Sequence, residues 1–234
     1  MPRQKQTKGK CAYCGKEFAK TGMARHLKAC LARQQVLAEE KGTKDTLFHV
    51  QVQGKYRPEY WMHLEMPASI TLEKFDAFLR GIWLECCGHL SMFKIHETRY
   101  EVLVDPTFDY WGEKPKTMKH KLSKVFYPGL KADYQYDFGS TTPLDVIVID
   151  QREGVPNKAQ PIYILSRNDP PDIPCENCGQ HQAMRIYTWH DYTALCDECG
   201  DASAYDDEGW LPVVNSPRVG ECGYTGDDAV DDLF

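Results

Sequence analysis

Two groups of cysteines constrain this chain more than any other feature of its sequence. The first group is Cys11, Cys14, His26 and Cys30, and the second is two C-x2-C pairs separated by seventeen residues, Cys175, Cys178, Cys196 and Cys199. Thiolates and imidazoles in sets of four are the usual ligands of tetrahedral Zn²⁺. The basic start of the chain lacks the apolar stretch of a secretory signal, so these pairs favour zinc over disulfides. We therefore expect two Zn²⁺ ions per chain and a cytoplasmic location.

The first group has the order of ligands of a small zinc module. His26 and Cys30 are four residues apart, so on a helix they face the same way, toward a Cys pair held on a turn. Residues 11–30 thus resemble the two-cysteine, two-histidine zinc finger, with the last histidine replaced by cysteine. The gap between Cys14 and His26 is eleven residues, whereas twelve is usual. Phe18 and Met23 take the places of the finger's small apolar core, and we expect this finger to fold independently of the rest.

Charge is distributed unevenly, and this bears on the partner of the finger. Residues 1–44 contain eleven Lys and Arg against three acids, whereas residues 169–234 contain two basic residues against fifteen acids. A basic head favours a polyanion such as nucleic acid. A protein partner and a purely structural role remain alternatives, because one finger spans only about 3 base pairs. The candidate nucleic-acid contacts are Lys20, Thr21, Arg25 and Lys28 on the finger, and Lys119 and Lys121 in a predicted lysine-rich helix near 115–126.

The second group resembles a zinc ribbon. Each Cys pair is followed by a glycine, Gly179 or Gly200, which suits a turn that aims backbone N–H groups at sulfur. Four cysteines complete a tetrahedron and leave no position for water, so this site is expected to be structural. His181 and His190 are then bystanders. The many acids around the ribbon would repel phosphate, so its surface favours a protein partner or simply braces the main domain.

The middle of the chain predicts an α+β domain. Alternating apolar residues indicate strands over 48–53, 59–66, 92–104 and 131–138, and apolar β-branched runs indicate buried strands over 143–150 and 161–166. Residues 71–85 have apolar residues at helical spacing, with Thr71 as N-cap. We predict a central mixed or antiparallel sheet flanked by two zinc modules, divided as 1–44, 45–168 and 169–234. No apolar run reaches the roughly 20 residues that cross a bilayer, so no membrane association is expected. We also expect no organic cofactor.

Two stretches carry a resemblance to a known family. They are FLRGIWLECCGHLSMFKI (78–95) and KVFYPGLKADYQYDFGSTTPLDVIVI (124–149). With the residues around them, about 46–168, they are similar to the plasmid pRiA ORF-3-like family, also known as insertion-element passenger or TnpR-like proteins. The resemblance rests on His89, Leu90 and Phe93 and on the motif from Tyr136 to Gly139, and the segment 210–226 is similar to the ending of members that carry the ribbon. It implies an α+β fold and an association with mobile elements, without a settled activity.

Other reactive side chains favour no enzyme strongly. Three thiols and an imidazole, Cys86, Cys87, His89 and Cys222, could form a third metal site. However, adjacent cysteines rarely share one zinc, and buried cysteines behave as small hydrophobes. Asp137 is expected to accept hydrogen bonds in a turn, and Tyr134, Tyr136 and Phe138 alternate as core residues. A nuclease-like hydrolase using Asp137, Asp145 and His89 is a further alternative, although no motif spaces these groups for catalysis.

Overall fold

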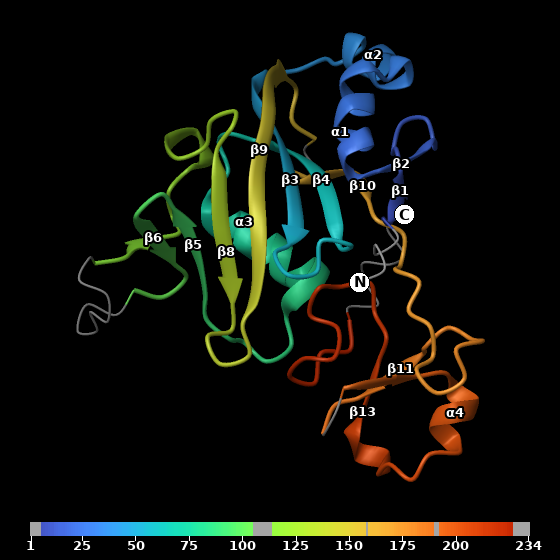
Figure 1. Cartoon of the computed structure of the whole chain (residues 1–234). Helices are drawn as coiled ribbons and strands as arrows, with labels where there is room; N and C mark the ends of the chain where they lie inside the picture. Colours follow the sequence, from blue (N-terminus) through green and yellow to red (C-terminus); the bar gives the residue numbers. More distant parts are fainter. Residues whose placement is uncertain (1–5, 105–113, 158, 190–191, 227–234) are drawn as a thin grey trace. The chain divides into compact units, whose positions relative to one another are not determined.

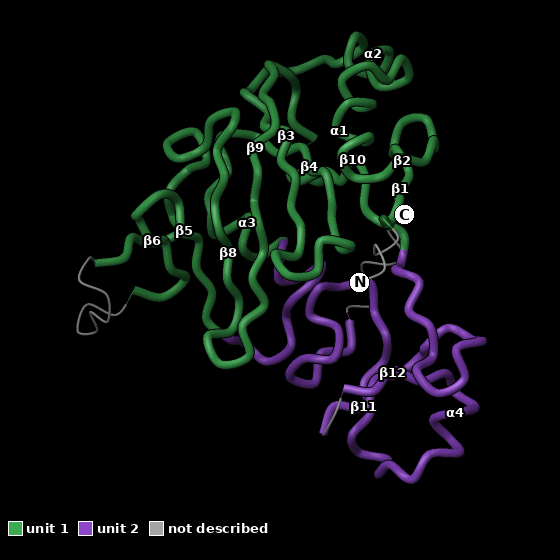
Figure 2. Tube along the Cα trace, viewed as in Figure 1, with its two compact units in different colours: residues 1–78, 90–169 green, residues 79–89, 170–234 purple. Residues whose placement is uncertain are grey.

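The computed structural model describes residues 6–104, 114–157, 159–189 and 192–226, and the chain divides into two compact units (Figure 2). Unit 1 contains residues 1–78 and 90–169, and unit 2 contains residues 79–89 and 170–234. The three-part division expected from the sequence remains a prediction. His190 and the end of the acidic tail lie outside the described residues. No described helix has both the length and the apolar composition needed to cross a bilayer.

Unit 1 is built on an eight-stranded sheet with the order β10-β4-β3-β9-β8-β5-β6-β7 (Figure 1). All neighbouring strands are antiparallel except β6 and β7, which are parallel. The sheet is therefore mixed, and the α+β prediction is confirmed. The strands are β3 (Asp45–Gly54), β4 (Trp61–Pro67), β5 (Ser91–Ile95), β6 (Thr98–Glu101), β7 (Lys116–Thr117), β8 (Lys131–Tyr136), β9 (Thr142–Gly154) and β10 (Tyr163–Arg167).

Helix α3 (Leu72–Leu79) begins where the sequence predicts, because the Lys74 backbone N–H donates to Oγ1 of Thr71 over 3.3 Å. Its apolar stripe provides a buried aromatic cluster. The Phe75 ring stacks on Phe93 of β5 with centroids 5.5 Å apart, and meets Phe126 edge-on at 6.3 Å. This cluster forms the core on one side of the sheet.

Strand β4 is buried on both faces, although its sequence alternates as a half-exposed strand would. Side chains that alternate along a strand point to opposite faces of the sheet. Met62, Leu64 and Met66 are fully buried, and Trp61, His63 and Glu65, which alternate with them, are also buried. The second set is covered by the N-terminal helices: His63 Nε2 lies 3.1 Å from the Lys20 carbonyl oxygen, and Arg33 contacts Glu65.

The N-terminal module consists of β1 (Lys8–Lys10), β2 (Glu17–Ala19), α1 (Lys20–Ala29) and α2 (Leu31–Ala38). It shares one apolar cluster with the sheet. Met23 and Leu27 of α1 pack together with Trp61 of β4 and Leu165 of β10. The finger therefore has no separate core of its own, and the expectation of an independently folded module is replaced by a shared one.

Backbone contacts also join this module to the sheet. The Ala12 N–H donates to the Leu165 carbonyl over 3.0 Å, and Gly9 forms a bridge with Asn168. A side chain at Gly9 would place its Cβ only 2.0 Å from the Arg167 carbonyl oxygen. Glycine is thus required here by the close approach of two backbones.

Unit 2 contains the π-helix η1 (Arg80–Leu84) and a three-stranded antiparallel sheet with the order β12-β11-β13. Its strands are β11 (Arg185–Tyr187), β12 (Thr193–Leu195) and β13 (Trp210–Pro212). The predicted helix 71–85 is thus realised as α3 followed by η1. The buried Tyr187 of β11 stacks on Tyr205 at 4.1 Å, and the Arg185 guanidinium lies over the Trp210 ring at 4.8 Å. The unit also contains α4 (Asp197–Asp201) and the 3-10 helix η3 (Asp207–Gly209).

The predicted lysine-rich helix near 115–126 is wrong. That region forms β7 and a single 3-10 turn, η2 (Leu122–Lys124). Its backbone is paired with the loop before α3, because the Leu122 N–H donates to the Ile70 carbonyl and the Ser123 N–H to the Ala68 carbonyl. These long-range hydrogen bonds replace the local ones that an α-helix would make.

The end of β8 also differs from the alternation of its sequence. Tyr134 and Tyr136 are fully buried as predicted, but Phe138 is 49% exposed. Asp137, which lies between Tyr136 and Phe138, has a φ of 62°. The chain therefore leaves the strand there, and Phe138 does not continue the buried face. Oδ1 of Asp137 accepts the Gly139 N–H over 2.9 Å, which confirms the expected role of Asp137 as a turn acceptor.

Candidate metal centres

The first cysteine group comes together at one end of the N-terminal module. Cys11 and Cys14 lie on the turn between β1 and β2, and His26 and Cys30 lie on α1 and at its end. The Cys11 and Cys30 sulfurs are 4.0 Å apart, Cys14 Sγ is 3.2 Å from His26 Nε2, and all four ligand atoms are within 4.8 Å of one another. Zinc bonds of about 2.3 Å to sulfur and 2.0 Å to nitrogen give tetrahedral edges of about 3.5–3.8 Å. The group therefore has the size of a zinc site, despite the gap of eleven residues.

Burial and backbone hydrogen bonding shift the pKa values of the thiols of this group in opposite directions. Burial raises the pKa of the Cys11 thiol, so without a positive partner this group would stay protonated. The Lys16 backbone N–H, by contrast, lowers the pKa of the Cys14 thiol. The His26 ring is held by stacking on Phe18 with centroids 4.3 Å apart. Phe18 is half-buried and Met23 fully buried, as the finger pattern predicts.

The second group, Cys175, Cys178, Cys196 and Cys199, also has its four sulfurs within 4.8 Å of one another. Backbone and amide N–H groups point at these sulfurs. The Cys178 N–H lowers the pKa of Cys175 to about 6, and Asn177 Nδ2 donates to Cys199 Sγ over 3.3 Å. Such donors stabilise thiolates in the way that a metal site needs.

The two glycines of the ribbon have different roles. Gly179 has a φ of 63° and turns the first knuckle, as expected. Gly200 lies in α4 instead, and a Cβ there would meet Arg185 Nε at 2.3 Å. His181 is exposed, lies 3.9 Å from Glu198, and is not among the grouped ligands.

A third group of ligands is present in unit 2, formed by Cys86, Cys87, His89 and Cys222. The sequence offers Cys86, Cys87 and His89 as near neighbours and Cys222 as a possible distant fourth ligand, and the structure brings all four together. The expectation of buried, hydrophobic cysteines fails at Cys87, which is exposed. Of the described residues, only these three groups offer the geometry for a metal ion, and neither Asp137 nor Asp145 belongs to one. The hydrolase alternative therefore gains no support.

The candidate nucleic-acid contacts are in several different environments. Lys20 Nζ donates to Gln53 and to the Pro58 carbonyl, and Lys28 pairs with Asp150 at 2.8 Å. Both of these lysines are thus engaged by the sheet of unit 1. Thr21 and Arg25, one helical turn apart on α1, are exposed, as are Lys119 and Lys121 near η2.

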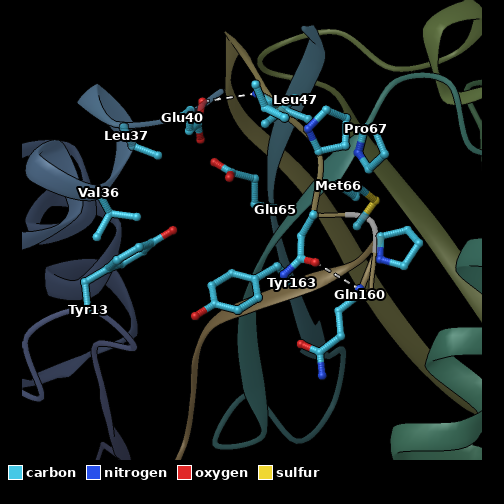
Figure 3. A pocket seen from close by; sticks show the side chains of 14 residues that line it. Tyr13, Val36, Leu37, Glu40, Leu47, Glu65, Met66, Pro67, Gln160 and Tyr163 are labelled. Carbon is cyan, nitrogen blue, oxygen red and sulfur yellow. Dashed lines mark hydrogen bonds between the residues drawn. The ribbon is translucent and has the colours of Figure 1, made fainter. Parts of the chain in front are cut away.

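A cavity of about 240 Å³ lies in unit 1 beside the N-terminal module (Figure 3). Tyr13 and Tyr163 line it with ring centroids 6.2 Å apart, and burial raises the pKa of Tyr13 to about 12. The carboxylates of Glu40 and Glu65 also line it. The cavity is slightly smaller than the roughly 300–1,000 Å³ that is usual for small-molecule sites.

An ionic network that includes these two lining carboxylates joins α2 to the sheet. Glu65 of β4 accepts hydrogen bonds from Arg33 Nη2 at 2.7 Å and from Arg152 Nε and Nη2 at 2.9 and 2.7 Å. Arg152 also donates to both carboxylate oxygens of Glu40, at 3.1 and 2.8 Å. Two arginines thus balance two carboxylates.

A search of curated proteins finds no match. A crystal structure from Methanosarcina mazei Go1, of the protein of unknown function MM3350, is similar with a TM-score of 0.43 and 20% identity. The match covers 58% of this chain and 76% of that one. The model of the family described as plasmid pRiA4b ORF-3-like protein matches residues 44–207. Since that match includes all eight strands of the large sheet and the ribbon cysteines, the chain belongs to the plasmid pRiA4b ORF-3-like family.

Proposed function

We propose that this protein is a non-catalytic, zinc-binding protein in which the groups Cys11/Cys14/His26/Cys30 and Cys175/Cys178/Cys196/Cys199 each hold one structural Zn²⁺. The observation that supports this most directly is the convergence of four ligand atoms in each group to within 4.8 Å. Cysteine-rich sets select zinc over magnesium or calcium, which prefer oxygen ligands. Four protein ligands leave no open position at which water could be activated.

Metal analysis of the purified full chain by native mass spectrometry tests this proposal. Cys14→Ser and Cys178→Ser should each lose one zinc ion relative to the unmodified chain. His181→Ala should lose none and serves as the matched control, since His181 belongs to the ribbon without joining its ligands. Metal-free protein, or disulfides linking these cysteines, would overturn the proposal.

For the partner, we propose nucleic acid bound on the exposed surface of the N-terminal module. This surface keeps a positive charge in the fold, because Lys8, Lys10, Lys16 and Arg25 are exposed around β1, β2 and α1, and Glu17 is the acid beside them. Cations on a surface bind phosphate through release of counterions, so affinity falls with salt. The family's plasmid-derived description is compatible with a role in mobile elements.

Fluorescence anisotropy with labelled DNA and RNA, repeated over a range of salt concentrations, measures this binding. Arg25→Ala should weaken binding and reduce the slope of log affinity against log salt by about 1. Lys74→Ala, at an exposed position of α3, should leave both quantities unchanged. Lys20→Ala should lower the stability of unit 1 and leave the salt slope nearly unchanged, because Lys20 is engaged by Gln53 and Pro58.

A protein adaptor is the second candidate, and the surface of the ribbon favours it. Met184, Trp189 and Tyr192 are each at least 50% exposed, in a segment rich in acids. Exposed aromatic side chains are enriched at protein interfaces. An absence of salt-dependent binding to DNA and RNA would reject the nucleic-acid proposal and favour this adaptor function.

A further inference from the structure

Three neighbouring side chains, Cys86, Cys87 and His89, meet the distant Cys222 in unit 2. Cys87 Sγ lies 2.9 Å from His89 Nε2 and 3.8 Å from Cys222 Sγ, and His89 Nε2 lies 3.3 Å from Cys222 Sγ. Cys86 Sγ lies 3.4 Å from Cys87 Sγ, and all four ligand atoms are within 4.8 Å of one another. These separations are close to those within the first group, where the sulfur–sulfur distance is 4.0 Å and the sulfur–nitrogen distance is 3.2 Å. The group therefore has the dimensions of a tetrahedron around one Zn²⁺.

Two turns carry these ligands. After η1, Gly88 adopts a φ of 76°, and its N–H donates to Glu85 Oε1 over 2.6 Å, which tightens the loop that carries both adjacent cysteines. In the second turn, Cys222 itself has a φ of 46° and is followed by Gly223 with a φ of 67°. A non-glycine residue with such a φ is uncommon, and here it turns the thiol toward the loop.

Charge balance favours thiolates at this position. Three thiolates and Zn²⁺ carry a net charge of −1, and the site needs a compensating cation close by. Arg218, which is fully buried, places Nη2 at 3.4 Å from Cys86 Sγ. A buried guanidinium beside a sulfur is the kind of neighbour that stabilises a metal-bound thiolate.

The use of cysteine across the chain points the same way. The sequence has ten cysteines, all in the described part of the chain and none in a disulfide there, and every one belongs to one of three four-ligand groups. The first and third groups combine three cysteines with one histidine, and the second uses four cysteines. No cysteine remains as a mere apolar filler.

We propose that Cys86, Cys87, His89 and Cys222 form a third zinc site, which fastens the C-terminal segment of unit 2 to the end of η1. Hydrogen bonding around the site supports this bracing role, because Ser216 Oγ donates to the Trp83 carbonyl over 2.6 Å and accepts the Arg218 N–H at 2.9 Å. His89 and Cys222 are 133 positions apart, so one zinc ion bound by both closes a long loop. Such a closure removes much conformational freedom from the unfolded chain. Because Cys87 and Cys222 are exposed, this site releases its metal to a chelator before the other two.

Native mass spectrometry of the full chain, combined with alkylation of cysteines and peptide mapping, tests the third site. We expect three zinc ions in the unmodified protein, two in Cys222→Ser and in His89→Ala, and three in the control His181→Ala. In the unmodified protein, Cys86, Cys87 and Cys222 should be protected from alkylation, and mild chelation should expose these three together and first. This second readout needs no substitution, so it holds even if a variant misfolds.

Two results would overturn the third site. One is rapid alkylation of Cys86, Cys87 and Cys222 in protein that retains two zinc ions, and the other is a disulfide among these three cysteines in such protein. Failure of the two sites proposed above is distinguishable, because peptide mapping would then show alkylation at Cys14 or Cys178.

Discussion

Replacement of Glu65 by glutamine tests whether the ionic network holds the N-terminal module on the sheet. The Glu65 and Arg33 side chains are only 10% and 11% exposed, and the network is neutral, with two arginines and two carboxylates. Glutamine removes one charge and leaves a buried net charge of +1. Removing one partner of a buried pair costs about 3–5 kcal/mol. Because the glutamine oxygen still accepts a hydrogen bond, we expect about 3 kcal/mol.

Urea unfolding is monitored by hydrogen exchange of peptides from β4 and α2. These peptides report the unfolding midpoint of unit 1 without interference from unit 2. With a denaturant slope of about 2 kcal/mol per molar urea, the midpoint should fall by about 1.5 M. The matched control is Glu97→Gln, which breaks an exposed pair with Lys94 at 3.8 Å where Glu97 is 91% exposed. An exposed pair contributes less than about 1 kcal/mol. Equal midpoint shifts in the two variants would refute the role of the network.

Three further predictions concern unit 1. Cys11→Ser should lose one zinc ion and also lower the midpoint of unit 1, because Cys11 shares its apolar cluster with Trp61; full retention of stability by the metal-depleted variant would contradict this. Gly9→Ala should cost about 1–3 kcal/mol by overpacking against Arg167, whereas Gly22→Ala in α1 should be neutral or stabilising, as thermal unfolding of both can show. Burial lowers the pKa of His49 to about 3 and of His63 to about 4, so both stay neutral in the folded state while the unfolded histidines protonate near pH 6.5. The free energy of unfolding present above pH 6.5 should therefore fall by about 1.4 kcal/mol per histidine at pH 5.5. His49→Gln should lose less of this free energy over the same range, as urea titrations that also monitor zinc content can show.

The sequence by itself determined the elements whose cause is local. Cysteine pairs with two residues between them specify turns, and the interval from His26 to Cys30 specifies one helical face, so the ligands of the first two groups could be named without a structure. Strands β3, β4, β8, β9 and β10 follow from alternation or from apolar β-branched runs, because side-chain direction along a strand depends only on its period of two.

Tertiary structure decided what covers each face and which distant segments meet. The alternation of β4 indicates one polar face, yet His63 and Glu65 on that face are buried because the N-terminal helices pack over them and supply Arg33 and the Lys20 carbonyl as partners. The lysine-rich region lost its predicted helix to long-range hydrogen bonds. Cys222 reaches Cys87 only through the packing of unit 2, since residues 135 positions apart share no local periodicity that a sequence pattern could express.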